Sequence, residues 1–146
     1  MPLIRAGTTE DLPHIAAIQA AAAEAAQWRL EDYLKYDLRV CIEDGAVVGF
    51  AVARDIASGE CELLNLAVDQ NFRRRGIGKF LLESLLKSRT KTSETGAGVC
   101  VFLEVRESNK IARAFYKQFG FHEVSMRSKY YDRPAESAIV MKFHSC

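Results

Sequence analysis

The sequence predicts a single α/β domain, built on a mixed central sheet with helices on both faces. The chain has 146 residues and is 49% hydrophobic, which suffices for one buried core. Strand-like and helix-like segments alternate along it, and the apolar run 99–105 (VCVFLEV) is typical of a strand buried on both faces. A strand, a helix and this strand in succession imply parallel pairing through a right-handed crossover. We therefore expect one domain over residues 1–146.

The first half of the chain is expected to contain two helices and four strands. Thr8 or Thr9 can cap the first helix, whose first turn tolerates Pro13 because no intrahelical donor is lost there. Asp44-Gly45 is a strong hairpin dipeptide between two of the strands. The expected elements are a strand at 3–6, a helix to about residue 26, a short helix at about 30–36, two strands within 38–55 and a strand at 61–69.

In the second half, apolar residues at helical spacing predict two amphipathic helices. The first runs from 76 to about 89, and Gly120 is placed to end the second, which spans 109–119. Strands follow at about 121–131 and 138–143. The residues expected on the buried faces are Ile77, Phe80, Leu81, Leu85 and Leu86 in the first helix, and Ile111, Ala112, Phe115 and Phe119 in the second.

Charge and composition argue against several classes of protein. The chain carries 20 Lys and Arg against 19 Asp and Glu, so no long-range field would draw it onto nucleic acid or a membrane. No secretory leader and no apolar run near the roughly 20 residues of a membrane span are present, which predicts a soluble, cytoplasmic protein. The three histidines lack partners at ligand spacing, so no metal is expected. The cysteines, interpreted as reduced thiols, are Cys41, Cys61, Cys100 and Cys146.

The segment 71–79 (NFRRRGIGK) has the features of a phosphate-binding turn. It joins a predicted strand to the start of a helix, where free backbone N–H groups and the helix dipole favour an anion. Its glycines allow close approach and its arginines add charge-assisted hydrogen bonds, whereas a solvated basic turn would not need two glycines at a helix start. Arg73 and Phe80 stand where a Walker A loop needs Gly and Ser or Thr. Leu81 is too large for the third small residue of a dinucleotide fingerprint.

The motif R-R-R-G-I-G at 73–78 resembles the R/Q-x-x-G-x-G/A signature of the GNAT superfamily of acetyl-CoA-dependent N-acetyltransferases. The order of the expected elements is similar to the GNAT fold over essentially the whole chain. The segments LLNLAVD, LEVRESN, ARAFYKQFGF and YYDRPAESAIVM resemble the RimI-type enzymes, which acetylate the N-terminal alanine of a ribosomal protein. The resemblance implies an enzyme that transfers acetyl from acetyl-CoA, without a metal, to a protein N-terminus such as that of a ribosomal protein.

The resemblance also implies roles for individual residues. Glu104 would act as the general base and Tyr116 as the general acid. The side chains that would flank the acceptor peptide are Trp28, Tyr130 and Tyr131. Residues 73–78 would hold the coenzyme pyrophosphate, while 66–68 would line the pantetheine arm and offer a backbone donor to the thioester oxygen. The full set implied for the coenzyme is Leu66, Ala67, Val68, Arg73, Arg74, Arg75, Gly76, Ile77, Gly78 and Asn109.

The residues themselves, apart from the resemblance, also favour Glu104 as a base and Tyr116 as an acid, but less specifically. Glu104 interrupts an apolar run at the C-terminal end of a predicted strand, the end beside which ligands bind in open α/β sheets. Partial desolvation there should raise its pKa towards neutrality, unless it pairs with Arg106 or Arg113. The phenol of Tyr116, with an ordinary pKa of about 10, stays protonated at pH 7 and could donate to a departing thiolate. The alternative for Tyr116 is a boundary residue with its hydroxyl in water.

Other functions remain open at this stage. Direct attack by an amine needs no cysteine, and Cys100 lies roughly 13 Å along the strand from Glu104. An α-amino group, with a pKa of about 8, suits one modest base better than a lysine at about 10.4. A GNAT enzyme that acetylates a small amine or a protein lysine is the first alternative. A coenzyme A sensor without turnover and a nucleic-acid-binding module that uses residues 73–75 are the others.

Overall fold

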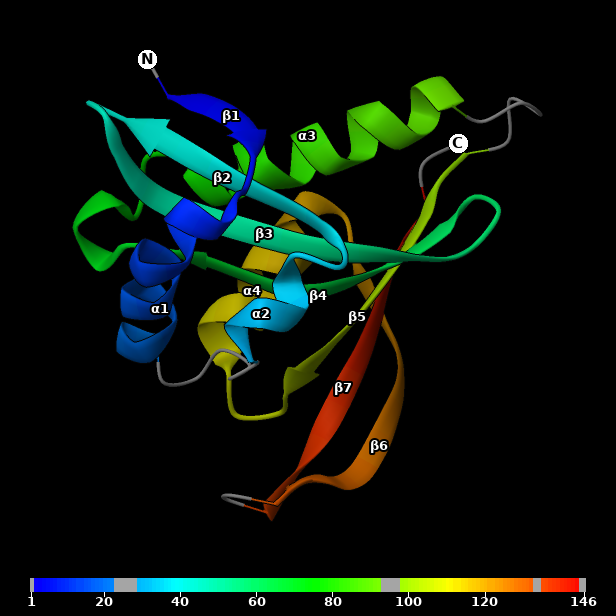
Figure 1. Ribbon diagram of the computed structural model, residues 1–146. Coiled ribbons are helices and arrows are strands. Elements are labelled where there is room, and N and C mark those ends of the chain that lie inside the picture. The colour runs from blue at the N-terminus through cyan, green and yellow to red at the C-terminus, as the bar shows by residue number, and fades with distance from the viewer. Residues whose placement is uncertain (1, 23–28, 93–97, 133–134, 145–146) are drawn as a thin grey trace. The chain divides into compact units, whose positions relative to one another are not determined.

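The computed structural model describes residues 2–22, 29–92, 98–132 and 135–144 (Figure 1). The chain forms two compact units: the first comprises Met1–Arg54 and Leu63–Thr92, and the second comprises Asp55–Glu62 and Ser93–Cys146. Both units combine helices with strands, and the strands pair in parallel and antiparallel directions. The predicted α/β class with a mixed sheet is therefore confirmed. No helix in the described ranges is long and apolar enough to cross a membrane.

The first unit is built on a sheet whose four strands are neighbours in chain order. They are β1 (Leu3–Ala6), β2 (Asp37–Glu43), β3 (Ala46–Ala57) and β4 (Glu60–Val68). The β1–β2 and β2–β3 pairs are antiparallel. Between β2 and β3, Asp44 and Gly45 have φ of 51° and 78°, as a two-residue turn with the twist of a hairpin requires. The hairpin predicted from this dipeptide is confirmed.

Helices cover both faces of this sheet. α1 (Leu12–Ala21) and α2 (Leu30–Tyr33) lie on one side of β2 and β3, and α3 (Ile77–Thr92) lies on the other (Figure 1). α1 stops before residue 26, because Ala22 leaves the helical conformation with φ −98° and ψ 70°. Two short 3-10 turns, η1 (Thr9–Asp11) and η2 (Gln70–Phe72), precede α1 and follow β4. The core beneath α1 and α2 contains Ile15, Ile18, Tyr33, Leu38, Val40, Phe50, Val52 and Ala67.

The buried face of α3 differs from the predicted one at one large residue. Phe80 was expected inward but is 38% exposed, whereas Leu82, which was not expected, is buried. Each residue turns the helix by about 100°, so Phe80 lies on the side of Leu81 that faces away from the buried Leu82 and Leu85. The buried apolar residues of this helix are Ile77, Leu81, Leu82 and Leu85.

The second unit contains β5 (Cys100–Arg106), β6 (His122–Asp132) and β7 (Ala135–His144). β5 pairs in parallel with the first residues of β4, from Glu60 opposite Cys100 to Glu62 opposite Phe102. This is the parallel pairing that the sequence predicted. On its other side β5 pairs antiparallel with β7, which in turn pairs with β6.

Only one face of β5 is fully buried, which corrects the expectation of burial on both faces. Val101, Leu103 and Val105 are buried, whereas Phe102, Glu104 and Arg106 are partly exposed. Successive side chains of a strand point to opposite faces, so Glu104 belongs to the more open face. The segment VCVFLEV is therefore a strand with one buried and one partly exposed face, and it looks continuously apolar because Phe102 lies on the partly exposed face.

α4 (Lys110–Phe119) packs on the buried face of the second unit. The ring of Phe143 on β7, opposite Val101, contacts Phe119 at 5.4 Å between centroids and Phe121 at 5.4 Å. Gly120 ends the helix with φ 128°, as predicted. Ile111 was expected inward but is 77% exposed, because it lies about 100° around the helix from Ala112.

Asp11 ties β1 to the start of α1. Its carboxylate accepts hydrogen bonds from both terminal nitrogens of Arg5, at 2.7 and 2.8 Å, and from the backbone N–H of Thr8 at 2.8 Å. The hydrogen bond from Arg5 is the main reason why the pKa of Asp11 falls to about 2, against the opposing effect of burial. The carboxylate thus replaces acceptors that the first turn lacks.

We predict that Asp11→Asn lowers the free energy of unfolding at pH 7 by about 1–3 kcal/mol, the usual value of hydrogen bonds to a charged group. Because the pKa of Asp11 is lowered in the folded state, its contribution is complete above pH 4 and is lost as the pH falls through about 2. Urea unfolding of wild type and variant at pH 7, 4, 3 and 2.5 should therefore show a difference that shrinks with acid. Glu10→Gln, at an exposed neighbour, is the control. A difference that is constant with pH would contradict this assignment.

Candidate functional site

The segment between β4 and α3 has an unusual backbone. Two of its residues have positive φ, Arg74 at 65° and Gly76 at 75°. For an arginine this conformation costs about 1–2 kcal/mol, and such strained residues concentrate at functional sites. A Cβ at Gly76 would meet no atom within 4 Å, so glycine is required there for its conformation and not for space. Turns of this kind aim successive backbone N–H groups into one concavity that suits an anion.

The start of α3 adds positive potential to this turn. The N–H of Phe80 donates to the carbonyl of Gly76 at 2.9 Å, and the N–H groups before it have no acceptor within the helix. No acidic residue lies in the first turn to offset the dipole. Arg73, Arg74 and Arg75 are exposed just before it. The geometry of this turn therefore fits a bound anion such as a pyrophosphate.

The first turn of α3 rests directly on β3 at Gly49. A Cβ on Gly49 would lie 3.2 Å from the carbonyl oxygen of Ala67, 3.2 Å from Cγ2 of Ile77 and 3.4 Å from Cδ1 of Leu81. These approaches are tighter than most real contacts, so a larger residue would push α3 outward. The buried side chain of Ile77 thus seats the helix and leaves only its backbone for a ligand.

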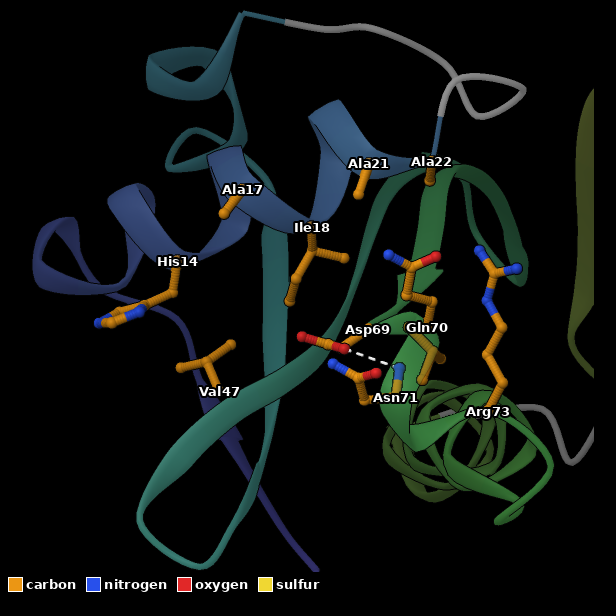
Figure 2. Close-up of a pocket in the computed structure, with 11 residues that line it drawn as sticks. His14, Ala17, Ile18, Ala21, Ala22, Val47, Asp69, Gln70, Asn71 and Arg73 are labelled. Atoms are coloured by element: carbon orange, nitrogen blue, oxygen red, sulfur yellow. Dashed lines mark hydrogen bonds between the residues drawn. The ribbon is translucent and has the colours of Figure 1, made fainter.

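The other charged groups near the turn are partly engaged. The guanidinium of Arg75 lies over the ring of Phe72, 4.8 Å from its centroid, and 4.0 Å from the carboxylate of Glu43. Arg73 lines a pocket of about 190 Å³ on the α1 side of the first unit (Figure 2). Its walls are His14, Ala17, Ile18 and Ala21 from α1, Ala22 just after it, Val47 and Val68 from the sheet, and Asp69, Gln70, Asn71 and Arg73 from the segment after β4. The three arginines therefore do not act as one equivalent cluster.

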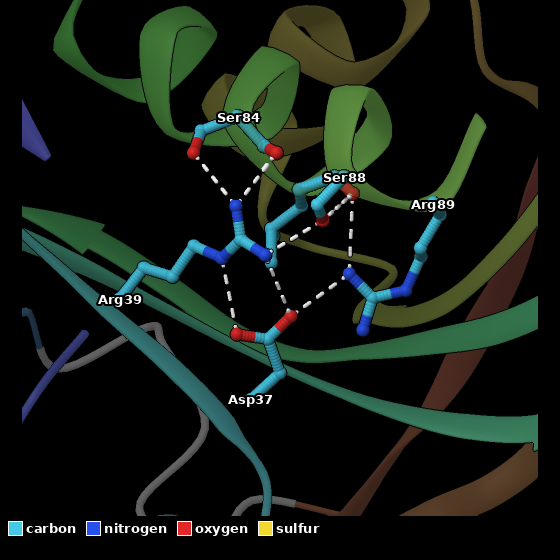
Figure 3. Close-up of polar contacts among 6 residues, drawn as sticks. Asp37, Arg39, Ser84, Ser88 and Arg89 are labelled. Carbon is cyan, nitrogen blue, oxygen red and sulfur yellow. Dashed lines mark hydrogen bonds and ion pairs between the residues drawn. The ribbon is translucent and has the colours of Figure 1, made fainter. Parts of the chain in front are cut away.

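A polar cluster fixes α3 farther along its length (Figure 3). Nη1 of Arg39 on β2 donates to the carbonyl and the hydroxyl of Ser84, at 2.7 and 2.8 Å, and Nη2 donates to Ser88 at 2.7 Å. Asp37 pairs with Arg39 at 3.0 Å and with Arg89 at 2.9 Å. Burial opposes ionisation of Asp37, but the two arginines prevail and its pKa is lowered. α3 is thus held at its middle as well as at its start.

The implied pantetheine strand, β4, is braced from behind by three buried polar side chains. Asn65 donates to the hydroxyl of Tyr33 at 2.9 Å, and that hydroxyl donates to Gln19 of α1. Desolvation raises the pKa of Tyr33 to about 12. The side-chain oxygen Oδ1 of Asn65 also accepts a hydrogen bond from the backbone N–H of Leu66 at 2.9 Å. The N–H of Leu66, one of the expected thioester donors, is therefore already engaged.

This brace was not expected from the sequence, although a signal existed. In the predicted strand 61–69, alternate positions hold Cys61, Leu63, Asn65 and Ala67, and all four are buried in the structure. A polar residue in a buried alternation needs partners, and here they come from two helices. The N–H of Asp69 donates to Val48 of β3 at 2.8 Å. Because successive N–H groups of a strand point to opposite edges, the N–H of Val68 points away from β3.

In the second unit, Glu104 forms an ion pair that the sequence did not reveal. Its Oε1 lies 2.7 Å from Nη1 of Arg127 on β6. The sequence favoured a partly desolvated Glu104 and left a pair with Arg106 or Arg113 as the alternative, but Arg113 pairs with Glu123 at 2.7 Å. The side chain of Glu104 is 20% exposed. Its charge is therefore compensated by Arg127 rather than left in an apolar site.

Asn109 is the N-cap of α4, and Tyr116 lies in the C-terminal half of this helix. Oδ1 of Asn109 accepts the N–H of Ala112 at 3.1 Å, so this side chain caps the start of the helix. The ring of Tyr116 is buried between Phe115 and Phe121, at centroid distances of 5.2 and 5.4 Å. Burial raises the pKa of Tyr116, so its phenol is protonated at neutral pH.

Glu104 and Tyr116 lie on opposite sides of the sheet of the second unit. Tyr116 packs with α4 on the face of Val101 and Phe143, whereas Glu104 points to the other face. The parallel β4–β5 pairing ends at Phe102, two residues before Glu104. The carboxylate of Glu104 and the phenol of Tyr116 thus lie on opposite faces of this sheet.

The expected acceptor-binding residues are described only in part. Trp28 lies outside the described residues. Tyr130 and Tyr131 belong to β6, and the pairing of Tyr131 with Glu136 places them near the end of the β6–β7 hairpin, but their side chains lie outside the described part of the structure. All the expected coenzyme residues except Asn109 belong to the first unit, and both expected catalytic residues belong to the second.

Comparisons with known proteins place the sequence among acetyltransferases. The sequence model of the acetyltransferase (GNAT) family matches residues 9–121. The [ribosomal protein bS18]-alanine N-acetyltransferase of Salmonella typhimurium is 39% identical over 113 residues, which cover 76% of this chain and 71% of that protein.

Two solved structures are similar over almost the whole chain. The ribosomal-protein-S18-alanine N-acetyltransferase from Escherichia coli has a TM-score of 0.79 at 31% identity and covers 99% of this chain and 94% of its own. Ard1 from Thermoplasma volcanium has a TM-score of 0.88 at 28% identity and covers 99% of this chain and 98% of its own. From the family match and these relatives it follows that the chain belongs to the GNAT family of acetyltransferases, enzymes that use acetyl-CoA.

Proposed function

We propose that the protein transfers the acetyl group of acetyl-CoA to the α-amino group of a protein N-terminus, with an alanine-starting ribosomal protein as the first acceptor to test. The turn with positive φ at Arg74 and Gly76 carries this proposal, because it offers backbone N–H groups at an uncompensated helix start. A pyrophosphate is the chemical group that matches it. Two of the similar proteins support the acceptor, since those from Salmonella typhimurium and Escherichia coli are named as N-acetyltransferases of the alanine of a ribosomal protein.

In this proposal the first unit binds the coenzyme. The turn holds the pyrophosphate, and the edge of β4 accommodates the pantetheine arm. Because the N–H of Leu66 already donates to Asn65, Val68 is the better candidate for the backbone donor to the thioester oxygen. Such a donor stabilises the oxyanion that forms when the amine attacks.

The second unit supplies the proton transfers. Glu104 accepts the proton of the attacking amine, directly or through water. Tyr116 acts on the leaving sulfur, but its raised pKa limits what it can do. Transfer of a proton from a phenol with a pKa above 10 to a thiolate whose thiol has a pKa of about 8.5 is uphill by at least about 2 kcal/mol. Tyr116 therefore serves as a hydrogen-bond donor to the sulfur more readily than as a full proton donor.

The experiment that tests the function is mass spectrometry of an acceptor panel incubated with acetyl-CoA and the protein. The panel contains peptides that start with Ala, Ser or Met, a blocked peptide with an internal lysine, and simple amines. We expect acetylation of α-amino groups with the Ala-starting peptide ahead. Acetylation confined to lysine or to small amines would be consistent with the family assignment but would contradict the proposal that a protein N-terminus is the acceptor. Absence of turnover with retained coenzyme binding would indicate a coenzyme A sensor.

We predict that Gly76→Ala weakens acetyl-CoA binding about 10-fold, because a left-handed backbone costs about 1–2 kcal/mol for alanine. Arg75→Ala should weaken binding as well, and the loss should shrink at high salt. Isothermal titration calorimetry measures both. Lys87→Ala removes one cation from the exposed side of α3 and is the matched control, for which we expect unchanged affinity. Equal affinity of wild type and Gly76→Ala would contradict the pyrophosphate site.

We predict that Glu104→Gln lowers kcat by roughly 100-fold or more, as expected for loss of general-base catalysis, and leaves the Kd for acetyl-CoA within threefold. The matched control is Glu123→Gln, which removes a carboxylate from the other face of the same sheet, where it pairs with Arg113. Steady-state rates with the preferred peptide and calorimetry with acetyl-CoA separate chemistry from binding. A wild-type kcat for Glu104→Gln would remove this residue from the mechanism.

A further inference from the structure

We propose that Arg127 is a positioning residue for Glu104: it holds one carboxylate oxygen in place, so that the other oxygen accepts the proton of the amine. This inference rests on the proposed role of Glu104 as the base. It adds a residue on β6 that lies 23 positions away in the sequence.

The register of the sheet explains how the contact is made. β7 lies between β5 and β6, so Arg127 must reach across one strand, about 10 Å from β5 to β6. Ala138 of β7 is opposite both Arg106 and Arg127. Its single methyl group leaves a path over β7 for the long side chain of Arg127. The guanidinium then meets Oε1 of Glu104 at 2.7 Å.

The ion pair engages only half of the carboxylate. Nη1 of Arg127 is bonded to Oε1, and none of the described residues forms a hydrogen bond to Oε2. The side chain of Arg127 is 53% exposed, so the pair is fixed in position without being sealed from solvent. A base needs this combination, because one oxygen must be oriented while the other stays available to the amine or to a water.

The other charged groups on this face are weaker candidates for the same role. In the described part of the second unit, the register places the following charged or titratable residues on the face of Glu104: Arg106 on β5, Lys142 and His144 on β7, His122 on β6, and Glu60 and Glu62 on β4. Lys142 lies over the ring of Phe102, with its Nζ 5.5 Å from the centroid. His122 is opposite Lys142, toward the other end of the sheet. Arg127 is the cation in contact with the carboxylate.

The chemistry is balanced without a further reactant. The bond from the amine nitrogen to the acetyl carbon forms and the carbon–sulfur bond breaks. The proton lost by nitrogen passes to Oε2 of Glu104 and then to solvent, and sulfur leaves as the coenzyme A thiolate. Arg127 keeps its own proton throughout, since an arginine is not deprotonated in proteins.

Arg127→Gln tests the proposal through the pH profile of kcat/KM. A cation beside a carboxylate favours the charged form, so its removal should shift the acidic limb of the profile to higher pH by roughly one unit. We also expect kcat to fall roughly 10-fold, as for a misplaced catalytic group, with the Kd for acetyl-CoA unchanged. Arg127→Lys, which keeps the charge, should return the limb to within a few tenths of its wild-type position. An unchanged limb and an unchanged kcat in Arg127→Gln would overturn the proposal.

Two further variants separate structural effects from positioning. Arg113→Gln breaks an ion pair of the same 2.7 Å length in the same unit, between α4 and β6. We expect it to change the Tm at most and to leave the acidic limb in place. His122→Gln should also leave the limb in place. A limb that moves equally in Arg113→Gln or in His122→Gln would contradict a specific role for Arg127.

A double-mutant cycle distinguishes failure of this proposal from failure of the proposed base. If Glu104 is the base, Arg127→Gln should have no further effect on kcat in the Glu104→Gln background. An undiminished 10-fold loss in that background would show that Arg127 acts elsewhere, and would overturn the inference while Glu104 keeps its role. Wild-type activity of Glu104→Gln alone would instead overturn the mechanism on which the inference rests.

Discussion

The close contact between β3 and the first turn of α3 is the constraint on which the proposed anion-binding turn depends. Gly49 has no side chain, and this allows Ile77 and Leu81 to approach the sheet within ordinary contact distances. With the helix start fixed, the chain that leaves β4 must reverse within a few residues. The positive φ values of Arg74 and Gly76 are the consequence of that reversal. The backbone strain and the ligand geometry thus have one origin.

Local signals were sufficient to predict most of the fold. Asp44-Gly45 and Gly120 marked the turn and the helix end correctly, because their positive φ is an intrinsic property of the residue types. The inward faces of the helices were less certain. Phe80 and Ile111 were placed inside on hydrophobicity, yet both are exposed, since the faces that the helices bury are set by the sheets beneath them. Propensity therefore predicted the elements, and tertiary packing decided which residues they bury.

The candidate site was predictable to the extent that its geometry is local. The turn at 73–78 is a contiguous motif, so it could be recognised in the sequence, whereas the positive φ of Arg74 could not. The ion pair of Glu104 joins residues of β5 and β6 across β7, and the register of β6 shifts at bulges that no local pattern announces. Arg127 could not be chosen among the arginines without that register. Trp28 and the tyrosines of β6 remain predictions, because their side chains lie outside the described residues.

Asp37 and Glu104 both form ion pairs with arginine, but the two carboxylates differ in how many of their oxygens are engaged. Asp37 uses both oxygens on two arginines, one of which also donates to the two serines of α3, and is therefore committed to structure. Glu104 uses one oxygen on one half-exposed arginine. If Glu104 exchanges a proton in every turnover, as we propose, one partner suits it better than two, because each further donor to a carboxylate favours the charged form and occupies a lone pair. The single ion pair holds this carboxylate in a largely apolar strand and leaves its second oxygen for the proposed proton transfer.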